Sequence, residues 1–379
     1  MRITGVQFRW VHLPLVTPFK TSVFTEYHRE ALLIELRTAE GMTGWGECVA
    51  MPDGIYSSES MESAAEVLRD QLIPMTLELG DKVTAEAARA VFTGVDGHPM
   101  AKAALEMALL DAQLRHRDTS LATYLGATRK AVPAGVSVGI MPMDELRETV
   151  RHYWFEKQYK RIKIKIEPGW DVEPVRMIRR LLGDDAPVQV DGNGAYTLDD
   201  AKKLAELDRY GLVMIEQPLA TNDLEGHAEL AQTLQTPICL DEPITSTADA
   251  LDAIGRGATA ILNIKPGRVG GYLEAKDIHD VCGRKVPLWV GGMLETGLGR
   301  AANVALAALE HFTLVGDLSA SERFYKRDIT DPIVMHNGMI QVPTRPGIGV
   351  EPDPEALDEA TKDVETILGT PEMVASRRN

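Results

Sequence analysis

The sequence predicts an α/β protein in which a (β/α)8-type barrel follows an α+β capping domain. From residue 133 onward, short apolar runs recur about every 25 residues, and there are eight of them. Amphipathic stretches with helical spacing separate these runs, which is the pattern of βα units and a parallel sheet. Eight such units favour a closed barrel over an open doubly wound sheet, the alternative arrangement.

The first 130 residues have a different pattern and predict the capping domain. Residues 2–15 and 30–50 alternate like strands, and they are followed by segments with helical periodicity at 60–77, 84–94 and 100–117. Strands that are followed by a run of helices indicate an α+β unit separate from the barrel.

The predicted barrel occupies residues 131–318. Its eight strands are expected at 134–140, 161–166, 187–191, 212–218, 237–243, 260–266, 287–292 and 312–317. Helices are expected between them, for example at 172–183, 198–211 and 272–283, and each of these segments ends in a glycine suited to a helix C-terminus.

Residues 319–379 are expected to pack back onto the capping domain. Within them, residues 329–350 return to a β-hairpin pattern. The last ten residues, 370–379, are mostly polar and are expected to be loose, as chain ends usually are.

Composition excludes several classes of partner. The net charge is −16 at pH 7, which argues against a nucleic-acid or anionic-membrane partner. No apolar run approaches the roughly 20 residues that span a bilayer, and the first residues lack the apolar core of a secretion signal. Three widely spaced cysteines suit a reducing compartment and suggest neither a disulfide framework nor a zinc site. We therefore expect a cytoplasmic protein.

The second predicted strand carries an unusual pair of lysines. Residues two apart in a strand share a face, so Lys163 and Lys165 lie together, opposite Ile162, Ile164 and Ile166. An edge strand with a solvated basic face is the simple alternative. The positions of other charged residues favour a second interpretation, in which the two lysines point into a reaction chamber rather than into water.

Five consecutive predicted strands end in ionisable residues. In order they are Lys165, Asp191, Glu216, Asp241 and Lys265, spaced 24 to 26 residues apart. The carboxyl ends of barrel strands carry the chemistry, because loops from all units converge there. Solvated strand ends are the alternative, but they give no reason for this order of charges.

The three acids predict a hard divalent cation. Neighbouring carboxylates repel one another unless a cation lies between them, and all-oxygen ligands suit Mg²⁺ or Mn²⁺ rather than zinc. Strands two and six lie on opposite sides of a barrel, so Lys165 and Lys265 are expected to face each other across the metal. This arrangement suits removal of a proton next to a carboxylate, with the metal stabilising the enediolate. We expect lowered pKa values for both lysines, because neighbouring cations disfavour the ammonium form.

The motifs at these strand ends resemble those of a known family. The stretches "KIK", "DGN", "EQP", "LDE" and "NIKPGRVGG" are similar to the enolase superfamily, within its muconate-lactonizing subgroup. "RIKIKIEPGWDVEPVR" and "GGMLETGLGRAANVALAAL" resemble most closely the branch of o-succinylbenzoate synthases and N-succinylamino acid (N-acylamino acid) racemases. The resemblance covers nearly the whole chain, and it implies a modified (β/α)7β barrel of the TIM type.

The resemblance implies a role for each motif residue. It implies metal ligands Asp191, Glu216 and Asp241, an acid/base pair Lys165 and Lys265, an electrostatic helper Lys163, and supporting residues Asn193, Glu242 and Arg268. In a synthase, Lys165 would take the proton and then protonate the leaving hydroxyl, while Lys265 would remain charged. In a racemase, the two lysines would exchange donor and acceptor roles.

The resemblance also places substrate selection in the cap loops and the barrel loops. The expected substrate-binding residues are Phe19, Phe24, Met51, Tyr56, Ser137, Gly292 and Met293, and we expect Tyr27 to act as a lid with the cap residues. For the cap residues, ordinary packing is the alternative.

Several functions stay open at this point. The substrate is expected to be a small carboxylate that bears a succinyl group, for a synthase of menaquinone biosynthesis, a racemase, or an enzyme that does both. A dipeptide epimerase is expected to carry Asp-x-Asp at the eighth strand, where this chain has only Asp317. A muconate cycloisomerase shares the charged set, and a non-catalytic metal-binding barrel is the remote alternative. A homo-oligomer is expected by analogy.

Overall fold

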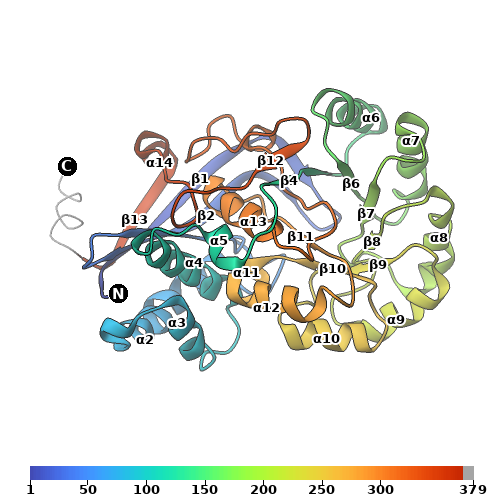
Figure 1. Cartoon of the computed structure of the whole chain (residues 1–379). Coiled ribbons are helices and arrows are strands. Elements are labelled where there is room, and N and C mark those ends of the chain that lie inside the picture. Colours follow the sequence, from blue (N-terminus) through green and yellow to red (C-terminus); the bar gives the residue numbers. More distant parts are fainter. Residues whose placement is uncertain (370–379) are drawn as a thin grey trace.

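A computed structural model describes residues 1–369 and shows an antiparallel capping sheet beside a curled parallel sheet (Figure 1). The predicted fold class is confirmed: strands and helices alternate in the parallel part, and in the N-terminal part of the cap three strands precede the helices. The expected loose tail, 370–379, lies outside the described residues. Within residues 1–369, no helix combines the length and apolarity needed to cross a membrane.

The cap is a four-stranded sheet with helices packed against it. Its strands are β1 (Ile3–Lys20), β2 (Thr25–Thr38), β3 (Thr43–Cys48) and β13 (Thr361–Leu368), in the order β13-β1-β2-β3. Its helices are α1 (Met61–Val67), a π-helical turn (Leu68–Leu72), α2 (Ile73–Glu78), α3 (Ala85–Phe92), α4 (Pro99–His116) and α5 (Leu121–Leu125).

Helix α4 lies directly against strand β3 because both surfaces are small. Alanines line the helix, and β3 presents Gly44 and Gly46 to it. A Cβ atom on either glycine would overlap the backbone of α4, at the carbonyl oxygens of Ala108 and Ala104. The glycines therefore set the distance between helix and sheet.

The parallel sheet has seven strands in sequential order. They are β5 (Gly135–Val138), β6 (Arg161–Lys165), β7 (Val188–Asp191), β8 (Ile215–Glu216), β9 (Ile238–Leu240), β10 (Ile261–Ile264) and β11 (Leu288–Val290). Their helices are α6 (Met143–Arg151), α7 (Val172–Leu182), α8 (Ala201–Ala205), α9 (Leu224–Thr233), α10 (Thr247–Gly255), α11 (Pro266–Val269), α12 (Tyr272–Cys282) and α13 (Gly297–Ala307). The predicted helix at 198–211 is split into α8 and two 3-10 turns.

The predicted eighth strand at 312–317 is wrong as a strand, although the segment occupies the eighth position. Leu314 and Asp317 donate backbone hydrogen bonds to β11, and Gly135 of β5 donates to Gly316 at 3.0 Å. Only an isolated bridge, Ala134 with Gly316, satisfies a strand pattern there. Irregular backbone thus joins the two edges of the curled sheet.

The C-terminal segment contacts both parts: the expected packing onto the cap holds for the end of residues 329–350, whereas the hairpin within them lies at the entry to the parallel sheet. Strand β12 (Met339–Gln341) pairs with β4 (Ala131–Pro133), where the chain enters the parallel sheet. The end of the same stretch reaches the cap, where Leu121 of α5 donates a backbone hydrogen bond to Gly347 at 2.7 Å and the Ile348 amide donates to Asp111 of α4 at 2.8 Å. Helix α14 (Pro354–Ala360) and β13 then follow on the cap, and β13 pairs with β1. The reason is that β4 offers an unpaired edge, whereas in the cap β1 takes its additional partner from residues 361–368.

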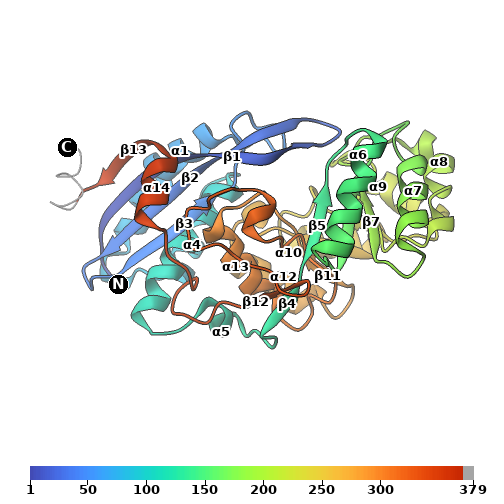
Figure 2. The ribbon, with the colours of Figure 1, turned by 90° about the horizontal axis from the view of Figure 1, so that it is seen from above.

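Strands β1 and β2 continue beyond the cap sheet as a long hairpin, which we call the arm (residues 12–30). Figure 2 shows it in blue, reaching from the cap toward β5. At its tip, Lys20 accepts a backbone hydrogen bond from Ile140, and the Ser22 hydroxyl donates to the Gly192 carbonyl at 3.3 Å. The tip therefore lies over the carboxyl ends of the parallel strands.

Candidate active site

Five charged residues gather at the carboxyl ends of five neighbouring strands. Parallel register places Lys165 beside Asp191 and Asp191 beside Glu216. Asp241 and Lys265 come directly after β9 and β10. All five side chains are buried, so the solvated strand ends considered as an alternative are absent.

The paired lysines of β6 point into this buried cluster. Strand β6 lies between β5 and β7, so the edge-strand alternative is wrong. The Lys165 ammonium is 2.5 Å from the Asp191 carboxylate and donates to the Asn193 side-chain oxygen at 2.8 Å. The Lys163 ammonium donates to Glu216 at 2.9 Å. The alternation of the strand thus presents both lysines to acids.

Lys265 makes the corresponding contacts on the other side of the cluster. Its ammonium is 2.7 Å from the Asp241 carboxylate and 3.0 Å from the Tyr56 hydroxyl, which comes from the cap. Arg268 also contacts Asp241 and donates to the Ile244 carbonyl at 2.7 Å. The two lysines therefore stand on opposite flanks of the three acids, with three strands between β6 and β10.

The expected lowering of the Lys265 pKa is wrong for this structure. Burial acts to lower that pKa, but the adjacent Asp241 and the Tyr56 phenol outweigh it, and the pKa lies well above its usual value. For Lys163, burial also acts to lower the pKa, yet Asp317, Glu216 and Asp191 raise it overall. The ammonium groups serve here as the counterions of the acids.

The three acids differ in how well their charge is balanced. Burial opposes ionisation of Asp241, but Lys265 and Arg268 hold its pKa well below the usual range. Burial, together with the charge of Asp191, raises the pKa of Glu216 to about 8. Glu216 is therefore the acid of the three whose ionised form is least well stabilised.

The donor set fits a hard divalent cation. Asp191, Glu216 and Asp241 supply only buried carboxylate oxygens, and the neighbouring Glu242 has a buried oxygen, Oε2, without a hydrogen-bond partner. If one carboxylate oxygen is taken from each of the three acids, the three oxygens do not all lie within 4.8 Å of one another. The reason is that the carboxylates turn toward their lysine and amide partners.

Several residues of the cluster were not predicted as site residues. Asp317 contacts Lys163 at 2.5 Å and Arg161 at 2.8 Å. The Asn263 amide donates to Glu216 at 2.6 Å. Trp289 lies under the Lys163 ammonium, 4.9 Å from the ring centre. Two features of the sequence could have identified the first two of these residues. Asp317 stands at the end of the predicted eighth strand, as the other charged residues do at the ends of theirs. Asn263 lies two residues before Lys265 and therefore on the same face of the strand.

A cavity joins both lysines to the cap. It is lined by all seven expected substrate-binding residues, Phe19, Phe24, Met51, Tyr56, Ser137, Gly292 and Met293, together with Lys163, Lys165, Lys265 and Asn193. It is also lined by polar residues that were not predicted, namely Thr21, Glu26, Arg29, Glu295, Arg300, Asp317 and Ser319. The expected lid residue Tyr27 does not line it and is 64% exposed.

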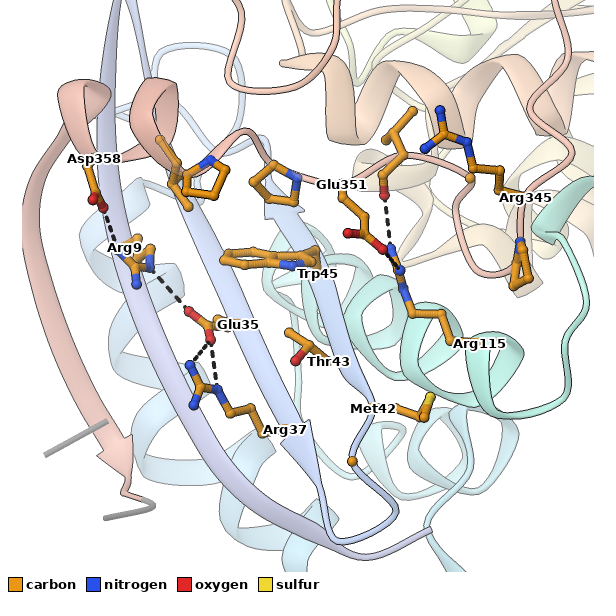
Figure 3. Close-up of a pocket in the computed structure, with 17 residues that line it drawn as sticks. Arg9, Glu35, Arg37, Met42, Thr43, Trp45, Arg115, Arg345, Glu351 and Asp358 are labelled. Atoms are coloured by element: carbon orange, nitrogen blue, oxygen red, sulfur yellow. Dashed lines mark hydrogen bonds and ion pairs between the residues drawn. The ribbon is translucent and has the colours of Figure 1, made fainter. Parts of the chain in front are cut away.

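A much larger cavity, of about 760 Å³, lies elsewhere in the cap (Figure 3). Three of its arginines already have acidic partners: Arg9 and Arg37 contact Glu35 at 3.3 and 2.8 Å, and Arg115 contacts Asp111 at 2.9 Å. No lysine of the strand-end cluster reaches it. Size alone would therefore select the wrong cavity for chemistry.

Comparison with known proteins gives consistent matches. Residues 3–126 match the mandelate racemase / muconate lactonizing enzyme N-terminal domain, and residues 145–356 match the enolase C-terminal domain-like family. An N-succinylamino acid racemase of Amycolatopsis sp is 57% identical over 363 residues, covering 95% of this chain and 98% of the relative. An o-succinylbenzoate synthase of Geobacillus kaustophilus is 45% identical over 365 residues, covering 96% of each. A crystal structure of an enolase superfamily member from Listeria innocua has a TM-score of 0.92 and 38% identity, covering 97% of this chain and 99% of that one.

Proposed function

This chain belongs to the mandelate racemase / muconate lactonizing enzyme family of the enolase superfamily, and we propose that it removes the proton α to the carboxylate of a succinyl-bearing substrate. The reaction is o-succinylbenzoate synthesis by dehydration, N-succinylamino acid racemisation, or both. The observation that carries the proposal is the placement of Lys165 and Lys265 on opposite flanks of three buried acids, with one cavity touching both lysines.

The acids Asp191, Glu216 and Asp241 would hold the divalent cation, Mg²⁺ or Mn²⁺. When bound, the cation supplies a Lewis acid for the substrate carboxylate. It would also stabilise the ionised form of Glu216, whose pKa is raised by burial and by the charge of Asp191. Asn193 positions Lys165, while Arg268 and Glu242 lie beside Lys265 and Asp241.

In dehydration, Lys165 takes the α-proton and then gives a proton to the departing hydroxide, so that water leaves. Lys265 remains an ammonium and stabilises the negative charge of the enediolate, which agrees with its raised pKa. Lys163 adds positive charge beside Lys165. In racemisation, one lysine removes the proton from one face of the α-carbon and the other returns a proton to the opposite face.

The cap and barrel residues that line the cavity would select the substrate. Phe19, Phe24, Met51 and Tyr56 close the cap side, and Ser137, Gly292 and Met293 border the barrel side. A dipeptide epimerase fits less well, because Asp317 stands without a second aspartate and is engaged by Lys163 and Arg161.

The test is an assay of the purified enzyme with Mg²⁺ or Mn²⁺. The menaquinone precursor and a panel of N-succinylated amino acids are the substrates, and an unsuccinylated dipeptide is the comparison. We expect turnover of at least one succinylated substrate and its loss in Lys165→Ala. Epimerisation of the dipeptide with both succinylated classes inert would reject the subgroup, and undiminished function of Lys165→Ala would favour a binding-only protein.

Some further expectations join this proposal. They are a division into residues 1–130, 131–318 and 319–379, a small-molecule substrate without nucleic-acid or membrane partners, a homo-oligomeric assembly and a cytoplasmic location. Size-exclusion chromatography with light scattering checks the assembly, and limited proteolysis checks the division of the chain.

A further inference from the structure

Two histidines and a glutamate converge on the arm, outside the strand-end cluster. His12 lies on β1, and His28 and Glu30 lie on β2. The register pairs His12 with Glu30 and Pro14 with His28, so the three side chains occupy one face of an antiparallel ladder. One ligand atom from each of them lies within 4.8 Å of the other two, and within residues 1–369 no other group of three or more His, Cys, Asp or Glu residues is this tight.

The geometry aims both imidazoles at one oxygen. His12 Nδ1 is 3.5 Å from Glu30 Oε1, and His28 Nε2 is 3.4 Å from the same atom. The two rings stack at 4.3 Å between centroids, with 29° between their planes. The side chains are about one-third to two-fifths exposed, so the cluster is open to solution.

The donor chemistry differs from that of the strand-end acids. Imidazole nitrogens favour borderline cations such as Zn²⁺, Cu²⁺ and Ni²⁺, whereas all-carboxylate sites favour Mg²⁺ and Mn²⁺. Two imidazoles and one carboxylate form a usual zinc ligand set when water takes the fourth position. Adjacent residues of a strand face opposite ways, so Arg29 points away from the three ligands and does not repel a cation there.

We propose that His12, His28 and Glu30 form a binding site for a borderline divalent cation, with Zn²⁺ as its expected occupant, at the base of the arm. The site is separate from the strand-end acids, and the proposal does not depend on the reaction that they catalyse.

The position of the site links it to the cavity. Arg29, between two of the ligands, lines the cavity from the opposite face of the arm. The regular pairing of β1 with β2 breaks between Pro14 and Phe19, directly beyond the ligands, and Phe19 and Phe24 line the cavity farther along. A cation held by both strands would tie them together at the last regular pairs. Occupancy would therefore restrict the part of the arm that covers the cavity.

The first experiment measures Zn²⁺ uptake by the full chain in excess Mg²⁺, using equilibrium dialysis and metal analysis. Wild type is expected to take up one equivalent more than the double variant His12→Asn/His28→Asn. His152→Asn is the matched control, because His152 also contacts a glutamate, Glu156, at 2.7 Å but has no second histidine in its cluster. It is expected to behave as wild type.

A second variant guards against loss of fold in the double variant. Glu30→Gln keeps both histidines and the shape of the third side chain. We expect Zn²⁺ to bind it roughly tenfold or more weakly, since even outer partners of a metal ligand change affinity about 10- to 100-fold. Circular dichroism of each variant verifies its fold.

The second experiment identifies the ligand type with Cu²⁺ as the probe. Electron spin echo spectra of the wild-type protein are expected to show modulation from remote imidazole nitrogens, which carboxylates and lysines cannot produce. The modulation should vanish in the double variant and persist in His152→Asn. Hydrogen exchange at residues 13–27 should slow when Zn²⁺ is added to wild type and not when it is added to the double variant.

Equal Zn²⁺ uptake by wild type and a folded double variant, unchanged affinity in Glu30→Gln, or imidazole modulation that survives in the double variant would each overturn the site. Unchanged exchange at 13–27 in the Zn²⁺-loaded wild type would overturn the tie across the arm. None of these results involves substrate turnover, so they stand apart from a failure of the proposed function.

Discussion

At the scale of single residues, the proposed chemistry depends on which face of the substrate α-carbon each lysine reaches. Lys165 and Lys265 lie on opposite flanks of the acids. Under the proposed function, each lysine would remove the α-proton of one enantiomer of a racemase substrate.

We predict that Lys165→Ala and Lys265→Ala abolish racemisation and each leave α-proton exchange with solvent for one enantiomer, opposite in the two variants. Loss of one acid/base group lowers the corresponding step by about 10²- to 10⁴-fold. NMR in D₂O with each enantiomer of an N-succinylamino acid measures the exchange. Lys157→Ala, at the surface pair with Glu322, is the control and should exchange both. Loss of the same enantiomer in both site variants would contradict the two-sided arrangement.

Glu106 on α4 gives a prediction for stability against pH. Burial raises its pKa from 4.5 to about 8, although the Leu273 amide and Arg89 act in the opposite direction. The folded state thus holds this proton more tightly than the unfolded chain does. The stabilisation that this provides is complete below about pH 4.5 and is lost as the pH rises through 8.

Glu106→Gln carries no such proton, so its stability relative to wild type should increase between about pH 5 and pH 8. The expected change is a few kcal/mol at most, since one pKa unit corresponds to about 1.4 kcal/mol. Calorimetry in excess Mg²⁺ at both pH values measures it. The exposed Glu62→Gln is the control and should show no such trend. A constant difference between Glu106→Gln and wild type would show that Glu106 is ionised throughout.

At the scale of elements, the stability of the cap depends on the close packing of α4 on β3. Gly44→Ala places a methyl group against the backbone of α4. We predict that the substitution lowers the free energy of unfolding by at least about 1–3 kcal/mol, the usual cost of overpacking. The atoms that the methyl group meets belong to the backbone, which cannot rotate away as a side chain can.

Urea unfolding measures this change, and Gly255→Ala is the matched control. Gly255 ends α10, and a Cβ there meets no atom within 4 Å. The free energy of unfolding of Gly255→Ala should stay within about 1 kcal/mol of the wild-type value. Equal stabilities of the two variants would mean that the helix and strand can separate without cost.

At the scale of the whole molecule, the fold and the proposed chemistry are expected to depend differently on the divalent cation. The buried acids already have cationic partners, since Lys165, Lys163 and Lys265 contact Asp191, Glu216 and Asp241. The fold is therefore expected to survive removal of the metal, while turnover is not.

We predict that EDTA abolishes turnover, leaves the far-ultraviolet circular dichroism unchanged, and lowers the Tm only by the amount that lost metal binding accounts for. Excess Mg²⁺ or Mn²⁺ should restore the activity. Unfolding at room temperature in EDTA, or full turnover without metal, would contradict this division of roles.

The sequence by itself determined the repeating plan of the molecule. Strand alternation and helical spacing are local periodicities, so the α/β barrel with its cap, and the order of charges from Lys165 to Lys265, could be predicted without coordinates. The same local logic placed Lys163 and Lys165 on one face.

Only the tertiary structure decided what those charges meet. The raised pKa of Lys265 depends on Asp241 and on Tyr56 from the cap, and the contact of Asp317 with Lys163 depends on the irregular segment that closes the sheet. The grouping of His12 with His28 and Glu30 likewise follows from the register of two strands. Electrostatic energies depend on distances of a few ångströms between residues far apart in the chain, and only the folded arrangement sets those distances.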